Sequence, residues 1–242
     1  MSAVPKSLAI IPARGGSKRL KGKNMQILGG KPLVAHTVEA AVESRCFKEI
    51  ILSSDDEEIL AVGRDHGATR AERRPEKLAG DKAKALEVVL DIVDRKEFGG
   101  RFEAVALLLP TAPFRQGFDI RAGFELLDDD VDSVVSVTTY EFPPQLGVTM
   151  DAQNGLLKPL FDPSPLITGD TRSQDQAPIY RPNGGFYLSW CRSLIRQRNF
   201  FKGRVRGYSM PRTASVDIDE ETDLMYAQRL LDTGKFVFQK NS

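Results

Sequence analysis

Five basic side chains fall within ten residues near the start of the chain, in the segment RGGSKRLKGK at positions 14–23. No acidic residue interrupts them. The glycines of this segment allow backbone N–H groups to approach a ligand closely, and Ser17 adds a hydroxyl donor. A phosphate-rich ligand is the favoured interpretation, and a solvated basic loop is the alternative.

The two best-known phosphate-binding motifs do not describe this basic loop. A Walker A loop needs Gly followed by four residues and then Gly-Lys-Ser/Thr, but the residue five before Gly22 is Ser17, and Lys23 is followed by Asn24. The dinucleotide pattern GxGxxG is also missing from the segment. The sequence therefore predicts a phosphate site of another kind.

Two carboxylates near the other end of the chain, Asp217 and Asp219, are separated by a single residue. In an extended segment both side chains point the same way. Together they could hold Mg²⁺, which accepts one or two protein carboxylates and fills its other positions with water and phosphate oxygens. The alternative is that residues 219–223 form the acid-rich first turn of the last helix, which its dipole favours.

Two other polar segments stand out: residues 74–76 in a polar loop, with Asp81 a little further on, and residues 109–115 after the predicted central strand. The carboxyl edge of a parallel sheet commonly hosts ligands, but proline after a strand also forms simple turns, so both interpretations stay open. His36 is predicted to be structural. His66 precedes a glycine at a predicted helix end, where a cation is mildly favoured.

Short apolar runs and helical periodicities alternate along the chain and supply the elements that position these residues. This alternation predicts an α/β, Rossmann-like fold with a mainly parallel sheet and helices on both faces. The predicted strands are 8–12, 50–52, 105–109 and 133–137, with ordered segments at 185–188 and 203–210. The predicted helices begin at Pro32 or span 55–65, 82–95, 119–127 and 220–231, the last with Leu224, Ala227 and Leu231 inward.

Residues 138–182 interrupt this rhythm with seven prolines and no helical period. The segment is predicted to be an arm inserted into one main domain formed by residues 1–137 and 183–242. A structureless loop of this length is unusual, so we expect either pairing strands or a second subunit to hold it, and oligomerisation is favoured.

The composition limits the possible partners. The 242 residues carry 34 Lys and Arg against 33 Asp and Glu, and this balance argues against nucleic acid and membrane surfaces as partners. No apolar run has the length of a membrane span, and the start of the chain does not predict export, so a cytoplasmic protein is expected. Two distant cysteines predict neither a disulfide framework nor a zinc site.

The chain resembles the acylneuraminate cytidylyltransferases in six segments that occur in order: IIPARGGSKRLKGKN (10–24), SSDDEEI (53–59), RRPEKLAGD (73–81), LLLPTAPFR (107–115), RPNGGFYL (181–188) and VDIDEETD (216–223). The resemblance implies a fold of the nucleotide-diphospho-sugar transferase type. It also implies an enzyme that joins CTP to a nonulosonic, sialic-acid-like sugar acid with the help of Mg²⁺. The products would be a CMP-sugar and pyrophosphate, formed by direct attack of the anomeric hydroxyl on the α-phosphate, with no side chain standing out as general base.

The same resemblance implies roles for individual residues and a homodimer in which the inserted arm supplies Arg172 to the neighbouring site. Catalytic roles are implied for Arg14, Lys18, Lys23 and Asp217, and metal binding for Asp217 and Asp219. Nucleotide contacts are implied for Ala13, Arg14, Gly15, Gly16, Ser17, Lys18, Lys23, Asn24, Arg74 and Asp81. Substrate contacts are implied for Leu109, Thr111, Arg172, Arg181, Tyr187, Phe200 and Phe201.

One position departs from the resemblance. The family commonly has Gln where this chain has Leu109, so we expect a sugar that differs from N-acetylneuraminate, such as legionaminic or pseudaminic acid. A 3-deoxy-manno-octulosonate cytidylyltransferase is an alternative, although residues 109–115 lack the acidic metal ligand usual there. A non-catalytic nucleotide-binding scaffold on the same fold is another, and intact Arg14, Lys23 and Asp217 argue against it.

Overall fold

The structure is a computed structural model that describes residues 5–80, 83–98 and 100–239. The chain divides into two compact units, one formed by Met1–Val137 with Pro182–Ser242 and the other by Thr138–Arg181. Strands β7 (Ser133–Thr139) and β10 (Tyr180–Trp190) carry the chain out of the first unit and back. The candidate active site described below belongs to the first unit.

A seven-stranded sheet in the order β11-β7-β10-β6-β1-β4-β5 forms the centre of the first unit. Strand β1 pairs in parallel with β4 and β6, β4 with β5, and β7 with β11, whereas β10 runs antiparallel to β6. The predicted mainly parallel sheet is therefore confirmed. The remaining strands span Ser7–Pro12 (β1), Phe47–Ser54 (β4), Arg70–Arg73 (β5), Ala104–Leu107 (β6) and Val205–Ser209 (β11).

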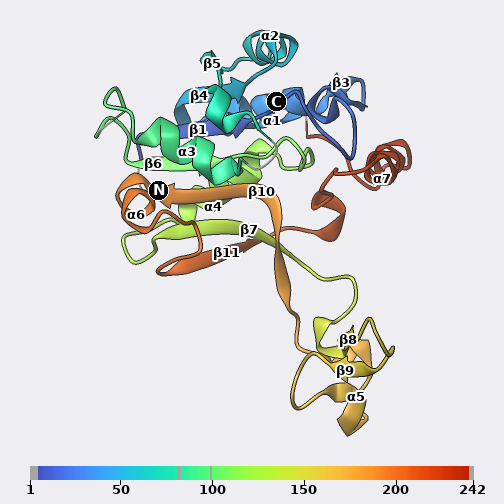
Figure 1. Cartoon of the computed structure of the whole chain (residues 1–242). Helices are drawn as coiled ribbons and strands as arrows, with labels where there is room; N and C mark the ends of the chain where they lie inside the picture. The colour runs from blue at the N-terminus through green and yellow to red at the C-terminus, as the bar shows by residue number, and fades with distance from the viewer. Residues whose placement is uncertain (1–4, 81–82, 99, 240–242) are drawn as a thin grey trace. The chain divides into compact units, whose positions relative to one another are not determined.

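Helices cover both faces of this sheet, as Figure 1 shows. Because successive strand residues point to opposite faces, Ala9 and Ile11 of β1 pack in one apolar cluster and Leu8 and Ile10 in another. The first cluster includes α1 (Leu33–Ser44), α2 (Glu57–Asp65) and α4 (Gly117–Glu125). The second includes α3 (Ala85–Val93) and α6 (Cys191–Gln197).

A third apolar cluster surrounds the last helix, α7 (Glu221–Asp232). Ala227 and Leu230 are buried in it, while Leu224 and Leu231 pack against it from partly exposed positions. Strand β2 (Ile27–Leu28), which pairs with β3 (Lys31–Pro32), contributes Leu28 to this cluster. The start of α1 contributes Leu33. The predicted inward face of the last helix is therefore present, with Leu230 added to it.

Some elements differ from the prediction. The helix predicted at 82–95 spans Ala85–Val93, and residue 82 lies outside the described residues. Edge strand β5 was not predicted because its sequence, RAER, is polar, and its side chains are only partly buried or exposed. Helix α6, with seven residues, was too short to show a helical period.

The second unit contains a small antiparallel pair, β8 (Val148–Met150) with β9 (Leu157–Pro159), and one turn of helix, α5 (Pro165–Thr168). Two 3-10 turns, η3 (Pro144–Leu146) and η4 (Ser173–Asp175), complete it. Pairing strands were one of the two ways in which we expected this proline-rich segment to be held. Among the described helices of the whole chain, none has the length and apolar character needed to cross a membrane.

Candidate active site

The basic loop, residues 14–23, follows β1 and is fixed to the end of the neighbouring strand β4. The Ala13 N–H donates to the Ser53 carbonyl at 3.0 Å. The Gly15 N–H donates to Asp55 Oδ1 at 2.8 Å. A Cβ at Gly15 would lie 2.7 Å from Asp56 Oδ2, so only glycine allows this close approach. The backbone of the loop is thus held by polar groups that follow β4.

The far end of the basic loop is closed by Asn24. Gly22 has a φ of 61° in the left-handed region, and the short helix η1 (Lys23–Met25) follows it. The side chain of Asn24 is buried, and its Nδ2 donates to the Arg14 carbonyl at 2.8 Å. The amide of Asn24 thus holds the loop, and its contact with CTP stays a prediction.

Arg74 lies at the end of edge strand β5, and its side chain is 7% exposed. Its Nη2 donates to the Ser53 carbonyl at 2.8 Å. Burial lowers the pKa of Arg74, the Asp55 carboxylate opposes this effect, and the Arg14 guanidinium adds to it. Arg14, Asp55 and Arg74 therefore influence one another electrostatically, although they follow three different strands.

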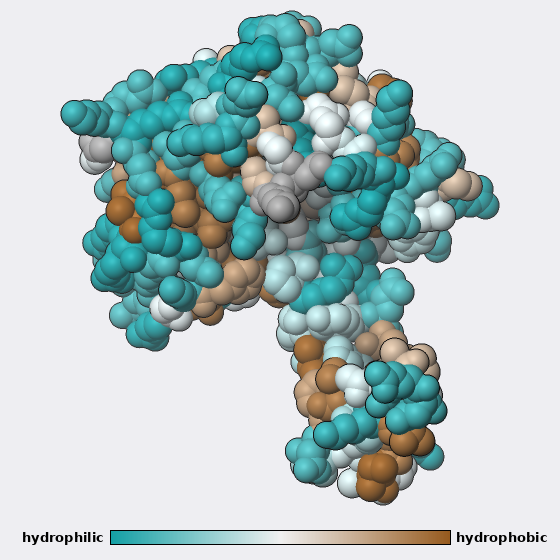
Figure 2. Space-filling view, viewed as in Figure 1, coloured by the Kyte–Doolittle hydropathy of each residue, from teal (hydrophilic) through white to brown (hydrophobic). Residues whose placement is uncertain are grey.

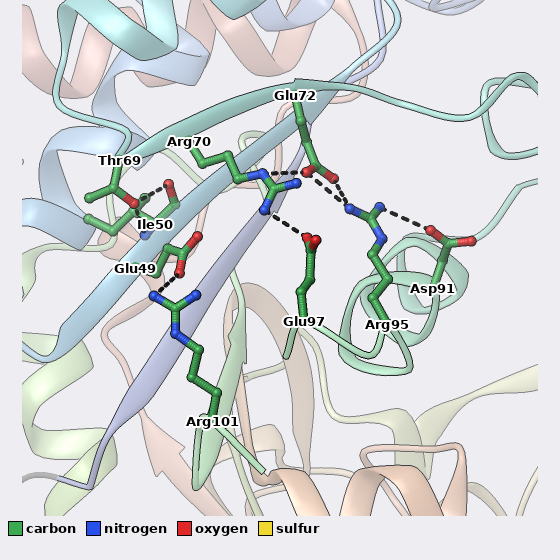
Figure 3. Close-up of polar contacts among 9 residues, drawn as sticks. All are labelled: Glu49, Ile50, Thr69, Arg70, Glu72, Asp91, Arg95, Glu97 and Arg101. Carbon is green, nitrogen blue, oxygen red and sulfur yellow. Dashed lines mark hydrogen bonds and ion pairs between the residues drawn. The ribbon is translucent and has the colours of Figure 1, made fainter. Parts of the chain in front are cut away.

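An ion-pair network ties β5, which carries the chain to Arg74, to helix α3 and the turn after it (Figure 3). Glu72 accepts from Arg70 Nε at 2.9 Å and from Arg95 Nη1 at 2.8 Å. Arg95 also pairs with Asp91 at 3.0 Å, and Asp91 with Lys77 at 3.1 Å. Since Glu72 is only 12% exposed, this network is screened by water less than a surface ion pair. It anchors the chain on both sides of Arg74, through β5 before it and Lys77 after it.

The Asp217–Asp219 segment shows the alternation that was predicted for it. Val216 and Ile218 are buried, whereas Asp217 is exposed and Asp219 is partly exposed. The Ile218 N–H donates to the Thr111 carbonyl at 2.7 Å. The acidic pair is thereby fixed to the loop that follows β6, and both carboxylates lie on the side away from the apolar cluster.

The loop that follows β6 is supported from below by a buried arginine. Arg115 is 1% exposed and donates to the Ala112 carbonyl at 3.1 Å and to Thr37 Oγ1 at 2.7 Å. Burial lowers the pKa of Arg115 to about 10, and Asp119 acts in the opposite direction. Arg115 connects this loop to helix α1.

Two ion pairs join the basic loop to the acidic segment. Lys23 Nζ lies 2.7 Å from Asp219 Oδ1, and Arg19 Nη2 lies 2.7 Å from Asp219 Oδ2. Burial acts to raise the pKa of Asp219, but the two cations outweigh it and hold the pKa below its ordinary value. The two motifs, almost 200 residues apart in sequence, thus form one polar surface.

Aromatic rings lie beside this surface. Tyr187 of β10 is 5.7 Å from Phe200 and 6.1 Å from Phe201, measured between ring centroids. Burial raises the pKa of Tyr187, and the negative charge of Asp217 raises it further, so the phenol lies within electrostatic range of the acidic segment. Leu109 packs against the same apolar cluster as Tyr187. Phe200 is buried and Phe201 exposed, so Phe201 is the ring open to solvent.

Some predicted site residues are not brought into this surface by the first unit. Arg172 and Arg181 belong to the second unit, where Arg172 precedes the η4 turn. Asp81 lies outside the described residues. Gly16 and Lys18 are exposed in the basic loop, and Ser17 is partly exposed. Over residues 5–80, 83–98 and 100–239, no group of three or more His, Cys, Asp or Glu side chains could hold a metal ion.

Two contributors to the site had no predicted role. Asp55 lies in one of the six segments that carry the resemblance, but its hydrogen bond with the Gly15 N–H was not predicted. Its position directly after a buried strand was the signal that could have indicated a role. Arg19 was counted among the basic residues only, and its pairing with Asp219 depends on a long-range contact.

Comparisons with known proteins show the family of the chain. A family model described as Cytidylyltransferase matches residues 8–157. The chain is 35% identical over 228 residues to the CMP-N,N'-diacetyllegionaminic acid synthase of Legionella pneumophila, covering 93% of this chain and 96% of that protein. It is 32% identical to the pseudaminic acid cytidylyltransferase of Campylobacter jejuni, with 93% and 96% covered. It is 34% identical to the N-acylneuraminate cytidylyltransferase of Streptococcus agalactiae, with 91% of this chain and 52% of that protein covered.

Solved structures agree on the fold. A CMP:2-keto-3-deoxy-manno-octonic acid synthetase complexed with CTP superposes with a TM-score of 0.67 at 17% identity, covering 95% of this chain and 99% of that one. The 4-diphosphocytidyl-2C-methyl-D-erythritol synthase of Anaerococcus prevotii gives 0.65 at 14% identity, covering 94% and 96%. At these identities the likeness shows the fold alone. From its family match and its relatives, the chain belongs to the cytidylyltransferase family and is a nucleotidyltransferase of the N-acylneuraminate cytidylyltransferase type.

Proposed function

We propose that this enzyme joins CTP to a nonulosonic acid and releases pyrophosphate and a CMP-sugar. One observation carries the proposal: the Lys23–Asp219 ion pair of 2.7 Å joins the basic loop to the acidic segment at a single edge of the sheet. A triphosphate and a divalent cation would need these two motifs side by side. The names of the three relatives, which specify diacetyllegionaminic, pseudaminic and N-acylneuraminic acids, support the sugar class.

The proposed reaction is a single displacement. The anomeric hydroxyl oxygen of the sugar forms a bond to the α-phosphorus of CTP, and the bond from that phosphorus to the bridging oxygen breaks. Pyrophosphate leaves with the electron pair, and no covalent enzyme intermediate is formed. Because negative charge grows on the leaving group, Arg14, Lys18 and Lys23 would stabilise the transition state more than the bound CTP.

The acidic segment fits a hard divalent cation such as Mg²⁺. Asp217 and Asp219 offer carboxylate oxygens on one side of an extended segment, and Mg²⁺ keeps its remaining positions for water and phosphate. Bound there, Mg²⁺ would polarise the α-phosphate and lower the pKa of the attacking hydroxyl. Both oxygens of Asp219 face cations in this structure, and Arg19, 61% exposed, is the partner that would give way.

For the sugar itself, we propose a deoxygenated relative of N-acetylneuraminate, of the legionaminic or pseudaminic class. Support comes from Leu109, which packs with Tyr187 against an apolar cluster and offers no hydrogen bond to a sugar hydroxyl. An apolar wall tolerates a missing hydroxyl better than a polar one, since no buried donor or acceptor is left unpaired.

We further propose that the inserted arm pairs with a second copy of the chain and supplies Arg172 to the neighbouring site. Large apolar side chains are exposed on the arm, and Figure 2 shows them as brown patches. The large apolar residues concerned are Phe142, Met150, Leu156, Leu157, Leu160 and Ile167, which are 58–77% exposed. Light scattering should give a dimer for the natural chain and a monomer for Ile167→Glu.

The function is tested with CTP, Mg²⁺ and four separate acids: N-acetylneuraminate, diacetyllegionaminate, pseudaminate and 3-deoxy-manno-octulosonate. Mass spectrometry of the CMP-sugar and coupled detection of pyrophosphate should both report turnover with a nonulosonic acid. Turnover with the octulosonate alone would replace the proposal, and preference for N-acetylneuraminate would remove the specificity argument. Unchanged turnover in Asp217→Ala would remove the metal assignment.

A further inference from the structure

The residues that follow helix α7 turn back and pack onto the core of the candidate site. The N–H groups of Lys235 and Phe236 both donate to the Leu230 carbonyl, at 2.9 and 3.1 Å, and reverse the chain. Further on, the Gln239 N–H donates to Gln116 Oε1 at 2.6 Å. We call residues 235–239 the C-terminal tail. Hydrogen bonds hold one end of the tail to Leu230 of α7 and the other end to Gln116, which precedes α4.

Between these two ends, the tail inserts two rings into an aromatic cluster. Phe236 stacks on Phe114 with centroids 4.0 Å apart and planes 18° apart. Phe238 stacks on His36 at 4.6 Å and also meets the edge of Phe114 at 5.8 Å. Val237, which separates the two rings in sequence, is 66% exposed. The tail therefore alternates like a strand, with its two rings inward.

The ring that both tail residues contact belongs to the active-site loop. Phe114 is fully buried and lies three residues after Thr111, whose carbonyl accepts the Ile218 N–H at 2.7 Å. Ile218 is itself buried in the same cluster as Phe114 and Phe236. It is the residue between the two proposed metal-binding carboxylates. The tail thus packs in the same apolar cluster as the loop after β6 and the acidic segment, which this hydrogen bond joins.

We propose that the C-terminal tail is a positioning element for the sugar and metal half of the active site. By stacking on Phe114, Phe236 and Phe238 fix the loop that carries Thr111, and through it the direction of Asp217 and Asp219. Leu20 of the basic loop packs against the same cluster, but the backbone of that loop is fixed by Asp55 and Asn24. The nucleotide phosphates would therefore be held mainly without the tail. The ligand names in this inference rest on the proposed function, but the mechanical link does not.

The link is tested without substrate by amide hydrogen exchange of the whole chain. Phe236→Ala should speed exchange at the Ile218 amide about tenfold, because local opening of this segment no longer has to break the stack between Phe114 and Phe236. Val237→Ala, whose side chain is exposed, should leave that rate unchanged. Phe98→Ala removes a buried ring from the separate cluster that includes α3 and α6, and should lower the unfolding temperature without selectively exposing Ile218.

Kinetics then separate positioning from a general loss of folded enzyme. In Phe236→Ala, the half-saturating Mg²⁺ concentration and the KM for the sugar acid should rise about fivefold, while the KM for CTP at saturating Mg²⁺ stays within twofold. Phe236→Tyr, which keeps the ring, should restore both values. If Phe236→Ala does not fold, Phe236→Leu takes its place with the same expected directions.

Two results would overturn the inference: an unchanged Ile218 exchange rate in a folded Phe236 variant, or a fall in kcat with every KM and the Mg²⁺ requirement unchanged. Failure of the proposed function looks different. In that case the natural chain forms no CMP-sugar from any of the acids, while the Ile218 exchange rate still responds to Phe236→Ala.

Discussion

The basic loop is fixed by hydrogen bonds from polar side chains, whereas the acidic segment rests on apolar and aromatic ones. Gly15 and Arg14 are held through backbone groups by Asp55 and Asn24. Asp217 and Asp219 instead flank Ile218, which is buried in a cluster with Phe114 and Phe236. One region is thus specified by directional contacts and the other by packing.

The difference matches what each region has to hold. Phosphate recognition by backbone N–H groups needs a fixed peptide geometry, and hydrogen bonds of 2.8 Å supply it. A cation between two carboxylates depends on the separation and direction of the two side chains, and the packing of Ile218 in the apolar cluster sets both. We infer that the polar region governs CTP binding and the apolar region governs the metal and the sugar.

The largest effect on activity is expected at Asp217, the exposed carboxylate of the acidic segment. Asp217→Asn keeps the size of the side chain but removes the charge that the proposed metal needs, and should lower kcat/KM by about 100-fold or more. Initial rates of pyrophosphate release measure this. Glu221→Gln, an exposed acid at the start of α7, is the matched control and should change the rate little. Equal losses in both variants would mean that only the general charge of this surface matters.

A smaller effect is expected in the polar region. Asp55→Ala removes the acceptor of the Gly15 N–H and the carboxylate beside Arg74, and should raise the KM for CTP about tenfold, as losing a charged hydrogen bond of about 1.5 kcal/mol would. Asp55→Asn keeps an acceptor oxygen, so its KM for CTP should lie between those of the natural enzyme and Asp55→Ala. The half-saturating Mg²⁺ concentration should not move, and a parallel shift of both constants would erase the distinction between the regions.

Substrate choice should respond at Leu109. Leu109→Gln places a hydrogen-bonding group where the sugar is proposed to lie, and should shift the ratio of kcat/KM values towards N-acetylneuraminate by about tenfold. Competition assays with paired acids give this ratio directly. Leu109→Met is the control, because it keeps the apolar character. A Gln variant with the natural preference would show that this side chain does not contact the sugar.

The smallest effect concerns pH and the aromatic cluster. Burial lowers the pKa of His36 below its ordinary 6.5, although the Leu28 carbonyl and Glu39 oppose this and Lys31 and Arg115 reinforce it. The unfolded chain therefore takes up this proton at a higher pH than the folded one. The contribution of neutral His36 to stability is present above pH 6.5 and is lost as the pH falls through the folded pKa.

The variant His36→Gln cannot titrate and keeps an N–H for the Leu28 carbonyl. Relative to this variant, the natural protein should lose roughly 2 °C or more of unfolding temperature between pH 7.5 and pH 5. Calorimetry at several pH values measures the difference. Parallel curves for the two proteins would show that His36 does not sense protons in the folded state.

The polar region was the easier one to predict from sequence. A buried strand followed by glycines and cations favours a phosphate site, and this pattern can be recognised because the strand and the loop are adjacent in sequence. The strand alternation of Val216–Asp219 was also local, and the structure shows it. Family resemblance then supplied the chemistry that spacing alone left open.

The remaining features depend on contacts between distant residues. The sequence around Asn24 does not indicate that its amide donates to the Arg14 carbonyl. The sequence around Arg19 does not indicate Asp219 as its ion-pair partner. The role of Phe236 was invisible for the same reason, since its stacking partner Phe114 lies more than a hundred residues away. Edge strand β5 was missed because ion pairs, rather than apolar burial, hold it.

The most direct test of the central chemistry follows both ends of the triphosphate in one reaction. CTP labelled with ³³P at the α-position and ³²P at the γ-position is incubated with the enzyme, Mg²⁺ and the preferred nonulosonic acid. We predict that all α-label consumed appears in the CMP-sugar and all γ-label in pyrophosphate, in equal amounts. Release of γ-label as free phosphate, or its transfer to the sugar, would contradict cytidylyl transfer at this site.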